Sequence, residues 1–272
     1  MDTALCTEDR VIYEAVQFSR LPPIELARKR RLLRCPECDG PAFFRKASRS
    51  GRAACFGARP HVDGCELAAP EQEPQDDGPG TDQDALHNPG ERIVVDFNFG
   101  AQVQPEHEEA PGLQPNPNRR GGFVGDGVRP DVRIHRRLSS LLRTLVEVPA
   151  FRQSGQLLEI DGRDEIAVRD FFIALDAVTP EHAGLFRGFW GMLSDARFST
   201  DRTLWLNSGG RDDISFCLDA DYVDGIYERY RIEDEEDLAG AYILAFGTLQ
   251  VSQNGKLYSP VATPGYISIR LA

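Results

Sequence analysis

The chain has 272 residues, 41% of them hydrophobic and 27% charged, so it can bury at least one core. Its formal net charge of −12 argues against broad, non-specific binding to phosphate backbones. The sequence has no apolar run long enough for a transmembrane helix. The first residues, MDTALCTEDR, lack the basic and then apolar pattern of a signal peptide, so we expect a cytoplasmic protein without a membrane partner. In a reducing compartment, clustered cysteines more often bind metal than form disulfides.

Residues 1–68 contain a cysteine cluster that predicts a zinc-binding module. Cys35 and Cys38 form a C-x-x-C motif, whose short turn aims two thiolates at one point, and a tetrahedral Zn²⁺ site needs two more ligands. We favour Cys35, Cys38, His61 and Cys65, because His61 and Cys65 form a compact pair around a turn glycine. Cys55 is only the alternate ligand, because its apolar context AACFGA is one in which a small buried thiol without a metal is common. The zinc would be structural and would supply folding energy to a module too small to have a core of its own.

Basic residues surround these cysteines: residues 1–65 carry 12 Lys/Arg against 8 Asp/Glu. Aromatic side chains stand among them, and this combination suits a phosphate backbone; the alternative is a solvated basic face. The candidate nucleic-acid contacts of the module are Arg28, Lys29, Arg30, Arg31, Arg45, Lys46, Arg49 and Arg52.

The segment from VIYEAVQF through RCPECDGPAFFRK to CFGARPH resembles the N-terminal zinc module of competence CoiA-like proteins. The likeness rests on a leading strand, a CP-x-C motif and a strand pair. Where the family has an HFAH-like element, this chain has CFGA, in which only Cys55 could supply a ligand, so Cys55 stays open as an alternative. The resemblance covers about the first quarter of the chain and implies a bacterial mobile-element or phage-defence setting.

CoiA-like proteins often continue into a restriction-like nuclease domain, which needs an Asp and then an E-x-K or Q-x-K pair to hold Mg²⁺ and orient water. Arg129-Pro130-Asp131 is similar to the first half of that motif. No E-x-K or Q-x-K pair follows within a segment that has the pattern of a strand. A degenerate nuclease is therefore only an alternative.

Residues 69–131 predict an acidic, Pro/Gly-rich, partly disordered linker. From residue 66 to residue 131 the chain holds 4 Lys/Arg against 14 Asp/Glu and few branched apolar residues. One segment within it, RIVVDFNFGAQV at 92–103, alternates between apolar and polar residues and predicts a strand added to a neighbouring sheet.

Residues 132–184 predict a short helical segment. Apolar residues recur at helical spacing from Ile134 to Val146, and Pro149 should end that helix. A second apolar set from Val168 to Leu175 predicts another helix. Thr179, followed by a proline, predicts an N-cap with Pro at the first helical position.

Residues 185–272 predict three strands, a helix and two or three further strands, which is the order of an OB-fold, a small Greek-key barrel. Asn254-Gly255 predicts the last hairpin. The pieces GFWGMLSDARF, TLWLNSG, ISFCL, LAGAYILAFGTLQVSQNGKLYSPV and ISIRL resemble the OB-folds of single-strand-binding proteins and of the exonuclease VII large subunit.

OB barrels bind single strands by stacking bases on aromatic side chains and by contacting phosphates with Lys and Arg. The candidate contacts here are Arg197, Trp205, Lys256 and Tyr258. Alternatively, Trp205 belongs to the core and Tyr258 covers the barrel end. The charge of residues 185–272, with 8 Lys/Arg against 13 Asp/Glu, opposes general binding to DNA, and the acidic run 233–237 predicts a solvated loop.

Together these features predict a multidomain α+β protein with a small zinc-binding β module, a linker, a helical segment and an OB-like β-barrel. We expect a non-enzymatic accessory protein that binds single-stranded DNA or RNA. A protein-interaction scaffold that uses the barrel for a protein partner is the alternative, because fold alone does not determine function. The sequence contains no P-loop, dinucleotide-binding fingerprint or G-x-S-x-G motif.

Overall fold

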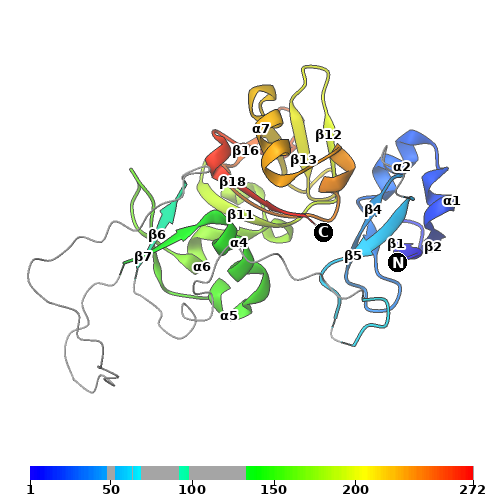
Figure 1. Cartoon of the computed structure of the whole chain (residues 1–272), viewed down its shortest axis with the longest axis horizontal. Coiled ribbons are helices and arrows are strands. Elements are labelled where there is room, and N and C mark those ends of the chain that lie inside the picture. Colours follow the sequence, from blue (N-terminus) through cyan, green and yellow to red (C-terminus); the bar gives the residue numbers. More distant parts are fainter. Residues whose placement is uncertain (48–52, 63, 69–91, 98–132, 272) are drawn as a thin grey trace, which may run out of the picture.

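The computed structural model describes residues 1–47, 53–62, 64–68, 92–97 and 133–271. Strands dominate and a few short helices accompany them, so the fold class is α+β, as predicted. Figure 1 shows the N-terminal module at the right, beside the C-terminal strands, with the middle part of the chain at the lower left. No helix within the described ranges is long and apolar enough to cross a lipid bilayer.

The N-terminal module is an antiparallel sheet with the strand order β2-β1-β3-β4-β5. Phe18, Phe44 and Phe56 pack together at its centre, with ring centroids 4.9–5.3 Å apart. The module therefore has a core of its own, contrary to the expectation that it is too small for one. Its elements are β1 (Thr3–Cys6), β2 (Val11–Glu14), α1 (Ala15–Ser19), α2 (Pro23–Lys29), β3 (Leu33–Arg34), β4 (Pro41–Arg45) and β5 (Cys55–Ala58).

The middle part is an α/β unit rather than the predicted helical segment. The segment predicted to be a strand forms β6 (Arg92–Asp96), which pairs in parallel with β7 (Arg133–Arg137) on one side and β8 (Leu157–Glu159) on the other. The sheet order is β7-β6-β8-β9, with β9 at Ile166–Ala167. Residues 69–91 and 98–131 of the predicted linker, which include the end of the 92–103 strand, lie outside the described residues.

Both helices predicted in this part are shorter than expected. The first begins only at Leu138, as α4 (Leu138–Glu147), because the residues before it form β7. Pro149 opens α5 (Pro149–Arg152) after α4 has ended. The second predicted helix is divided into α6 (Val168–Phe171) and the strand β10 (Phe172–Ala174). Strand β10 pairs with a strand of the C-terminal part, and the turn η1 (Leu175–Ala177) follows it. Thr179 caps the turn η2 (Pro180–His182), as predicted.

The C-terminal part contains a four-stranded sheet, β10-β11-β15-β18, and a five-stranded sheet, β12-β13-β14-β17-β16. The predicted helix and the predicted Asn254-Gly255 hairpin, which joins β16 to β17, are both present. The elements are β11 (Phe186–Met192), β12 (Asp195–Phe198), β13 (Leu204–Asn207), β14 (Ser215–Leu218), α7 (Ala220–Tyr230), η3 (Glu235–Leu238), β15 (Tyr242–Thr248), β16 (Gln250–Val251), β17 (Leu257–Pro260), η4 (Pro264–Tyr266) and β18 (Ile267–Arg270).

Strands β11 and β15 are buried on both faces, because alternate side chains enter two different cores. Phe189 and Ile243 join the core between the two C-terminal sheets. Trp190, Leu244 and Phe246 point the other way and pack against α4, α6 and the middle sheet. The middle part of the chain therefore covers one face of the C-terminal part.

Candidate metal centre and aromatic face

The four predicted zinc ligands lie together at one end of the N-terminal module. The ligand atoms of Cys35, Cys38, His61 and Cys65 all lie within 4.8 Å of one another. The two sulfurs of Cys35 and Cys65 are 3.9 Å apart, and His61 Nδ1 lies 3.4 Å from Cys38 Sγ and 3.2 Å from Cys65 Sγ. Tetrahedral zinc with Zn–S bonds of about 2.3 Å separates two sulfurs by about 3.8 Å. The cluster is therefore close enough to bind one metal ion and is compatible with zinc. Cys55 lies on β5, opposite Arg45, and does not belong to the cluster.

Backbone hydrogen bonds fold the C-x-x-C turn that positions two of these ligands. The N–H of Cys35 donates to the carbonyl of Gly40 at 2.8 Å, and the N–H of Asp39 donates to the carbonyl of Cys35 at 3.0 Å. Gly40 is required for close packing, since a Cβ there would lie 2.6 Å from the carbonyl oxygen of Pro60 and 3.3 Å from Cys38 Sγ. The strand pair β3 and β4 thus presents the turn to the segment that carries His61 and Cys65.

The thiols of Cys38 and Cys65 are both partly exposed, but their pKa values are shifted in opposite directions. Hydrogen bonds from the backbone N–H groups of Val62 and Gly40 lower the pKa of the Cys38 thiol to about 6. Loss of solvent contact, together with the Glu37 carboxylate, raises the pKa of Cys65 to about 12. A bound cation favours the thiolate form of both. Glu37 also accepts hydrogen bonds from the N–H groups of Glu66 and Leu67 at 3.0 and 3.2 Å, which ties the segment after Cys65 to the turn.

Two of the predicted nucleic-acid contacts are engaged by carboxylates of their own module. Arg28 pairs with Glu8, although its side chain is 55% exposed. Lys29 is buried, and its ammonium lies 2.8 Å from Asp9 and 2.5 Å from Glu25. Lys29 therefore does not belong to a solvent-exposed basic face.

Two further arginines of the predicted basic patch join the module to the C-terminal part. Arg30 is buried and donates to both carboxylate oxygens of Glu236 at 3.1 and 2.7 Å. Arg31 donates to both oxygens of Asp195 at 2.7 and 3.2 Å. The acidic run 233–237 is therefore not the solvated loop that the sequence predicts, because part of it receives the N-terminal module.

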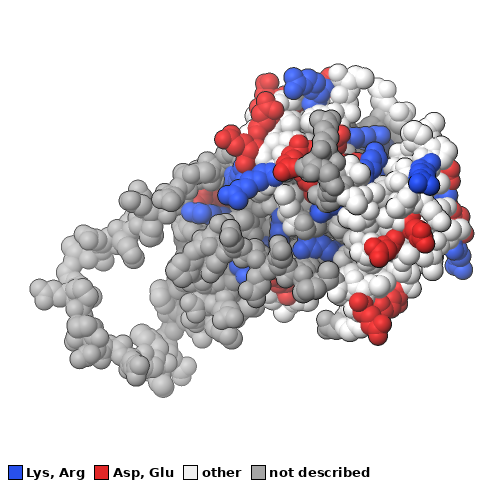
Figure 2. Space-filling model, turned by 45° about the vertical axis from the view of Figure 1, so that its right-hand side comes forward, with Lys and Arg blue, Asp and Glu red and all other residues white. Residues whose placement is uncertain are grey.

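Arg45 and Lys46 extend the same junction. The guanidinium of Arg45 donates to the backbone carbonyl of Ala239 at 2.9 Å, and the N–H of Lys46 donates to Glu236 at 3.2 Å. The ammonium of Lys46 lies 3.5 Å from the same carboxylate, and half of that side chain is exposed. On the face that Figure 2 shows, basic and acidic side chains are interspersed rather than gathered into one basic area. Arg49 and Arg52, and the nuclease candidate Asp131, lie outside the described residues.

The carboxylate that receives Arg31 begins a buried polar row across the five-stranded sheet. Asp195, Asn207 and Ser215 are register neighbours on β12, β13 and β14, and all three are nearly inaccessible to solvent. Asn207 donates to Asp195 and accepts from Ser215 at 2.8 Å. Burial raises the pKa of Asp195, but Arg31, with help from Arg30 and Asn207, outweighs it and holds this pKa below its ordinary value. The sequence signal for this row was weak, because Asp195 and Asn207 stand at the ends of short strands.

The predicted aromatic contacts meet next to this row on the outer face of the sheet. The rings of Trp205 and Tyr258 have centroids 6.1 Å apart at an angle of 54°, and both side chains are half-buried. Arg197 is exposed and stands directly opposite Trp205 in the β12–β13 register. Trp205 is not part of the interior core, where its strand neighbours Leu204 and Leu206 lie.

Lys256, the fourth predicted contact of this part, is half-buried beside the loop that precedes β14. Its ammonium donates to the carbonyls of Gly210, at 3.1 Å, and of Asp213. Burial lowers the pKa of Lys256, and the nearby charges of Arg31 and Arg197 lower it further. Arg197 and Lys256 therefore bring positive charge next to the aromatic pair, whereas Arg31 is compensated by Asp195, and the carboxylates of Asp212 and Asp213 lie near Lys256.

Comparisons with known proteins add little to this geometry. No family model matches the sequence, and no curated protein matches it. A solved structure assigned as an aspartyl-tRNA synthetase from Leishmania major Friedlin aligns at 10% identity with a TM-score of 0.25. The alignment covers 37% of this chain and 21% of that one, so the chain spans about a fifth of that protein. A likeness this weak carries no argument about fold or function.

Proposed function

We propose that this chain is a zinc-containing, non-enzymatic protein that binds single-stranded DNA or RNA on the outer face of its five-stranded C-terminal sheet. The observation that carries the proposal is the half-exposed pair of Trp205 and Tyr258 with Arg197 beside it. Base stacking on aromatic rings, with guanidinium groups at the phosphates, is the usual chemistry of single-strand recognition.

The strand pairings support an OB-like barrel as the scaffold of this face. Only Leu193 and Ser194 separate β11 from β12, and only Leu249 separates β15 from β16, so each pair is one bent strand that serves both sheets. The antiparallel pairings are β11 with β15, β12 with β13, β13 with β14 and β16 with β17. The strands β14 and β17 pair in parallel. OB-folds bind oligonucleotides on the face of their second and third strands, which correspond here to β13 and β14.

The charge of the chain limits what this face can do. Because the net charge is −12, only the local cations Arg197 and Lys256 favour a phosphate backbone, and we expect few phosphate contacts and a shallow dependence on salt. The zinc module then acts as a support: its arginines hold the edge of the face at Asp195 rather than contacting nucleic acid themselves. The resemblance to CoiA-like modules is consistent with a role in nucleic-acid metabolism.

The test is fluorescence anisotropy of labelled single-stranded DNA and RNA, titrated with the full zinc-loaded chain at low and physiological salt. Trp205→Ala and Tyr258→Ala should each weaken binding by about 1–3 kcal/mol, because each removes one stacking surface. Phe198→Ala is the matched control, since Phe198 is also exposed but contacts Tyr227 instead. Arg197→Gln should lower the salt slope by about 1.

Absence of binding at low salt would contradict the proposal and favour a protein-interaction scaffold. Mg²⁺-dependent cleavage that is lost on Asp131→Ala would instead support the degenerate nuclease. Equal loss of binding in Phe198→Ala would show that the aromatic pair has no specific part in it.

The structural zinc is tested by metal analysis of purified variants. Cys65→Ser should lose the metal and expose the N-terminal module to proteolysis, because three ligands hold zinc far less tightly than four. Cys55→Ser, outside the cluster, should keep one zinc per chain and the thermal stability of the parent. Loss of zinc in Cys55→Ser with retention in Cys65→Ser would show that the ligand set is wrong.

A further inference from the structure

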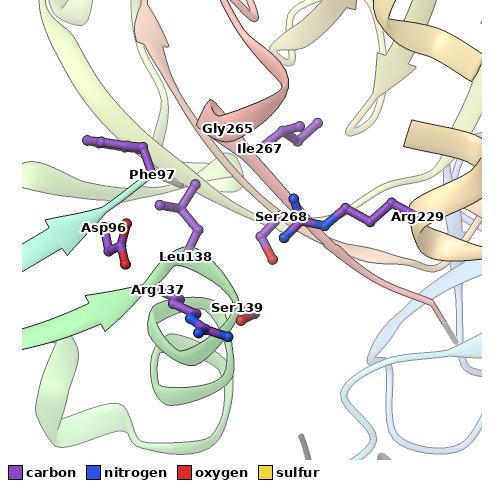
Figure 3. A pocket seen from close by; sticks show the side chains of 9 residues that line it. All are labelled: Asp96, Phe97, Arg137, Leu138, Ser139, Arg229, Gly265, Ile267 and Ser268. Carbon is purple, nitrogen blue, oxygen red and sulfur yellow. The ribbon is translucent and has the colours of Figure 1, made fainter. Parts of the chain in front are cut away.

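Two surface features of the molecule have no part in the function proposed for the Trp205 face. One is a recess between α4, β6, α7 and β18 (Figure 3). Its arginines, Arg137 and Arg229, are exposed, so little distinguishes it from ordinary surface. The other is strand β2, at the outer edge of the N-terminal sheet, whose side chains are largely exposed although most of them are apolar.

Strand β2 is an open edge of this sheet. Its inner side pairs with β1, whereas no strand that the structure describes pairs with its outer side. The opposite edge, β5, is occupied, because Met1 and Phe56 exchange two backbone hydrogen bonds at 3.0 and 3.2 Å. Figure 1 shows β2 and α1 on the side of the module that faces away from the C-terminal strands. An open edge presents backbone donors and acceptors that a further strand can bind.

The side chains of β2 favour association with another strand. Ile12 is 57% exposed and Val11 is 43% exposed, and Val16 at the start of α1 is 56% exposed. Natural edge strands commonly prevent association with a lysine or a proline, and β2, with the sequence VIYE, contains neither. Two adjacent β-branched residues are instead well suited to packing in a sheet.

The hydrogen bonds of β2 determine which of its residues face outward. The N–H of Ala15 donates to the carbonyl of Asp2 at 3.0 Å, so the backbone groups of Ala15 face β1. Because alternate residues of an antiparallel strand face the same neighbour, Tyr13 and Val11 also face β1. The N–H and C=O of Ile12 therefore point away from β1, at the centre of the open edge.

Two opposite charges flank Ile12 symmetrically. Arg10 precedes β2 and Glu14 ends it, and both are exposed. Neither side chain forms an ion pair or a hydrogen bond with any residue that the structure describes. If a second β2 pairs antiparallel about a two-fold axis at Ile12, each Arg10 lies opposite the Glu14 of the other copy. The neighbouring registers that keep the same backbone groups facing each other place Glu14 opposite either Glu8 or Ile12.

We propose that β2 binds β2 of a second copy of this chain, so that two N-terminal sheets form one continuous antiparallel sheet. The two Ile12 residues would exchange two backbone hydrogen bonds, and the two pairs of Arg10 and Glu14 would set the register. Four strand residues from each copy make a small interface, so the association is weak and depends on concentration. The edge belongs to other elements than the Trp205 face, and it is independent of the function proposed for that face.

The experiment is sedimentation equilibrium of the full, zinc-loaded chain between about 1 µM and about 1 mM. The average mass should rise from one copy to two as the concentration increases. Ile12→Pro removes the outward N–H and none of the hydrogen bonds to β1, so it should keep the fold and weaken the dimer at least about tenfold. Val251→Pro is the matched control, because Val251 is a 46% exposed β-branched residue on β16, the edge strand of another sheet. It should leave the association unchanged.

Two results of this experiment would overturn the proposal. A chain that stays monomeric up to about 1 mM does not pair through β2, and the open edge is then left for a strand of another protein. A dimer that Ile12→Pro leaves intact, or that Val251→Pro weakens equally, is formed by a different surface. Thermal melting at the lowest concentration, where the chain is monomeric, shows whether Ile12→Pro keeps the fold.

Charge reversal tests the register itself. Arg10→Glu and Glu14→Arg each place like charges opposite each other at both ends of the strand pair, so each should weaken the dimer about tenfold. The double variant restores opposite charges and should dimerise like the parent. A double variant as weak as the single variants would contradict this register. Binding of single-stranded oligonucleotides should be the same in all these variants, so a failure of the dimer and a failure of the Trp205 face are distinguished.

Discussion

Removal of Arg31 should destabilise the docked N-terminal module more than removal of any exposed arginine. The side chains of Arg31 and Asp195 are only 15% and 5% exposed, and two hydrogen bonds join them. Breaking a buried ion pair from one side costs about 3–5 kcal/mol, because the remaining charge stays buried without compensation. Asn207 still donates to Asp195 after the change, so we expect a value at the lower end, about 3 kcal/mol for Arg31→Ala.

A double-mutant cycle measures the pair itself. Arg31→Ala, Asp195→Asn and the double variant are unfolded in urea and followed by tryptophan fluorescence, and the coupling energy should be about 2 kcal/mol. Arg34→Ala is the control, since the exposed Arg34 side chain makes a single hydrogen bond within the described residues, at 3.2 Å, and its loss should cost less than about 0.5 kcal/mol. A coupling energy below about 0.5 kcal/mol would place the pair with ordinary surface salt bridges and refute the reasoning.

The same pair predicts a dependence on pH. Because Arg31 holds the folded pKa of Asp195 below its ordinary value, the stabilisation is present above the unfolded pKa of about 3.9 and is lost as the pH falls through the folded pKa. Without Arg31, only Arg30 and Asn207 still oppose the burial that raises the pKa of Asp195, and protonation of Asp195 then relieves the poorly compensated charge. The difference in unfolding free energy between parent and Arg31→Ala should therefore be constant near neutral pH and shrink in acid. A difference that grows in acid would contradict this sign.

Two glycine substitutions test the packing around the module. Gly40→Ala would bring a Cβ to 2.6 Å from the carbonyl of Pro60, so zinc affinity in a competition with a chelator should fall, and an unchanged affinity would show that the turn can relax. Gly240→Ala would bring a Cβ to 2.2 Å from the ring of Phe43 at a positive φ of 81°, so limited proteolysis should release the N-terminal module faster, whereas protection equal to that of the parent would contradict a tight contact there.

The sequence predicts local features of this molecule better than long-range ones. The C-x-x-C motif, the hairpin at Asn254-Gly255 and the cap at Thr179 depend on neighbouring residues, so their signals are visible in a few letters. The strand β7 was missed because its partner β6 lies about 40 residues earlier, and only that pairing makes residues 133–137 extended.

The junction of the zinc module was missed for a related reason. Arg30 and Glu236 are separated by 206 residues, and each stands in a run of like charge that on its own indicates a solvated or phosphate-binding surface. Complementary runs far apart in one chain can neutralise each other, but charge composition does not reveal which runs meet. The outer aromatic face was easier to predict, since strand alternation alone separates Trp205 from Leu204 and Leu206.

The two-sided burial of β11 and β15 determines how this chain can be divided for experiments. A fragment that begins at residue 185, where the sequence suggests a boundary, would leave Trp190, Leu244 and Phe246 facing water. Such a fragment would expose a large apolar surface, and its strand β11 would lose its parallel partner β10. We therefore expect it to self-associate on expression. The smallest piece that can be studied alone therefore begins before β6, and the segment between β6 and β7 has to travel with it.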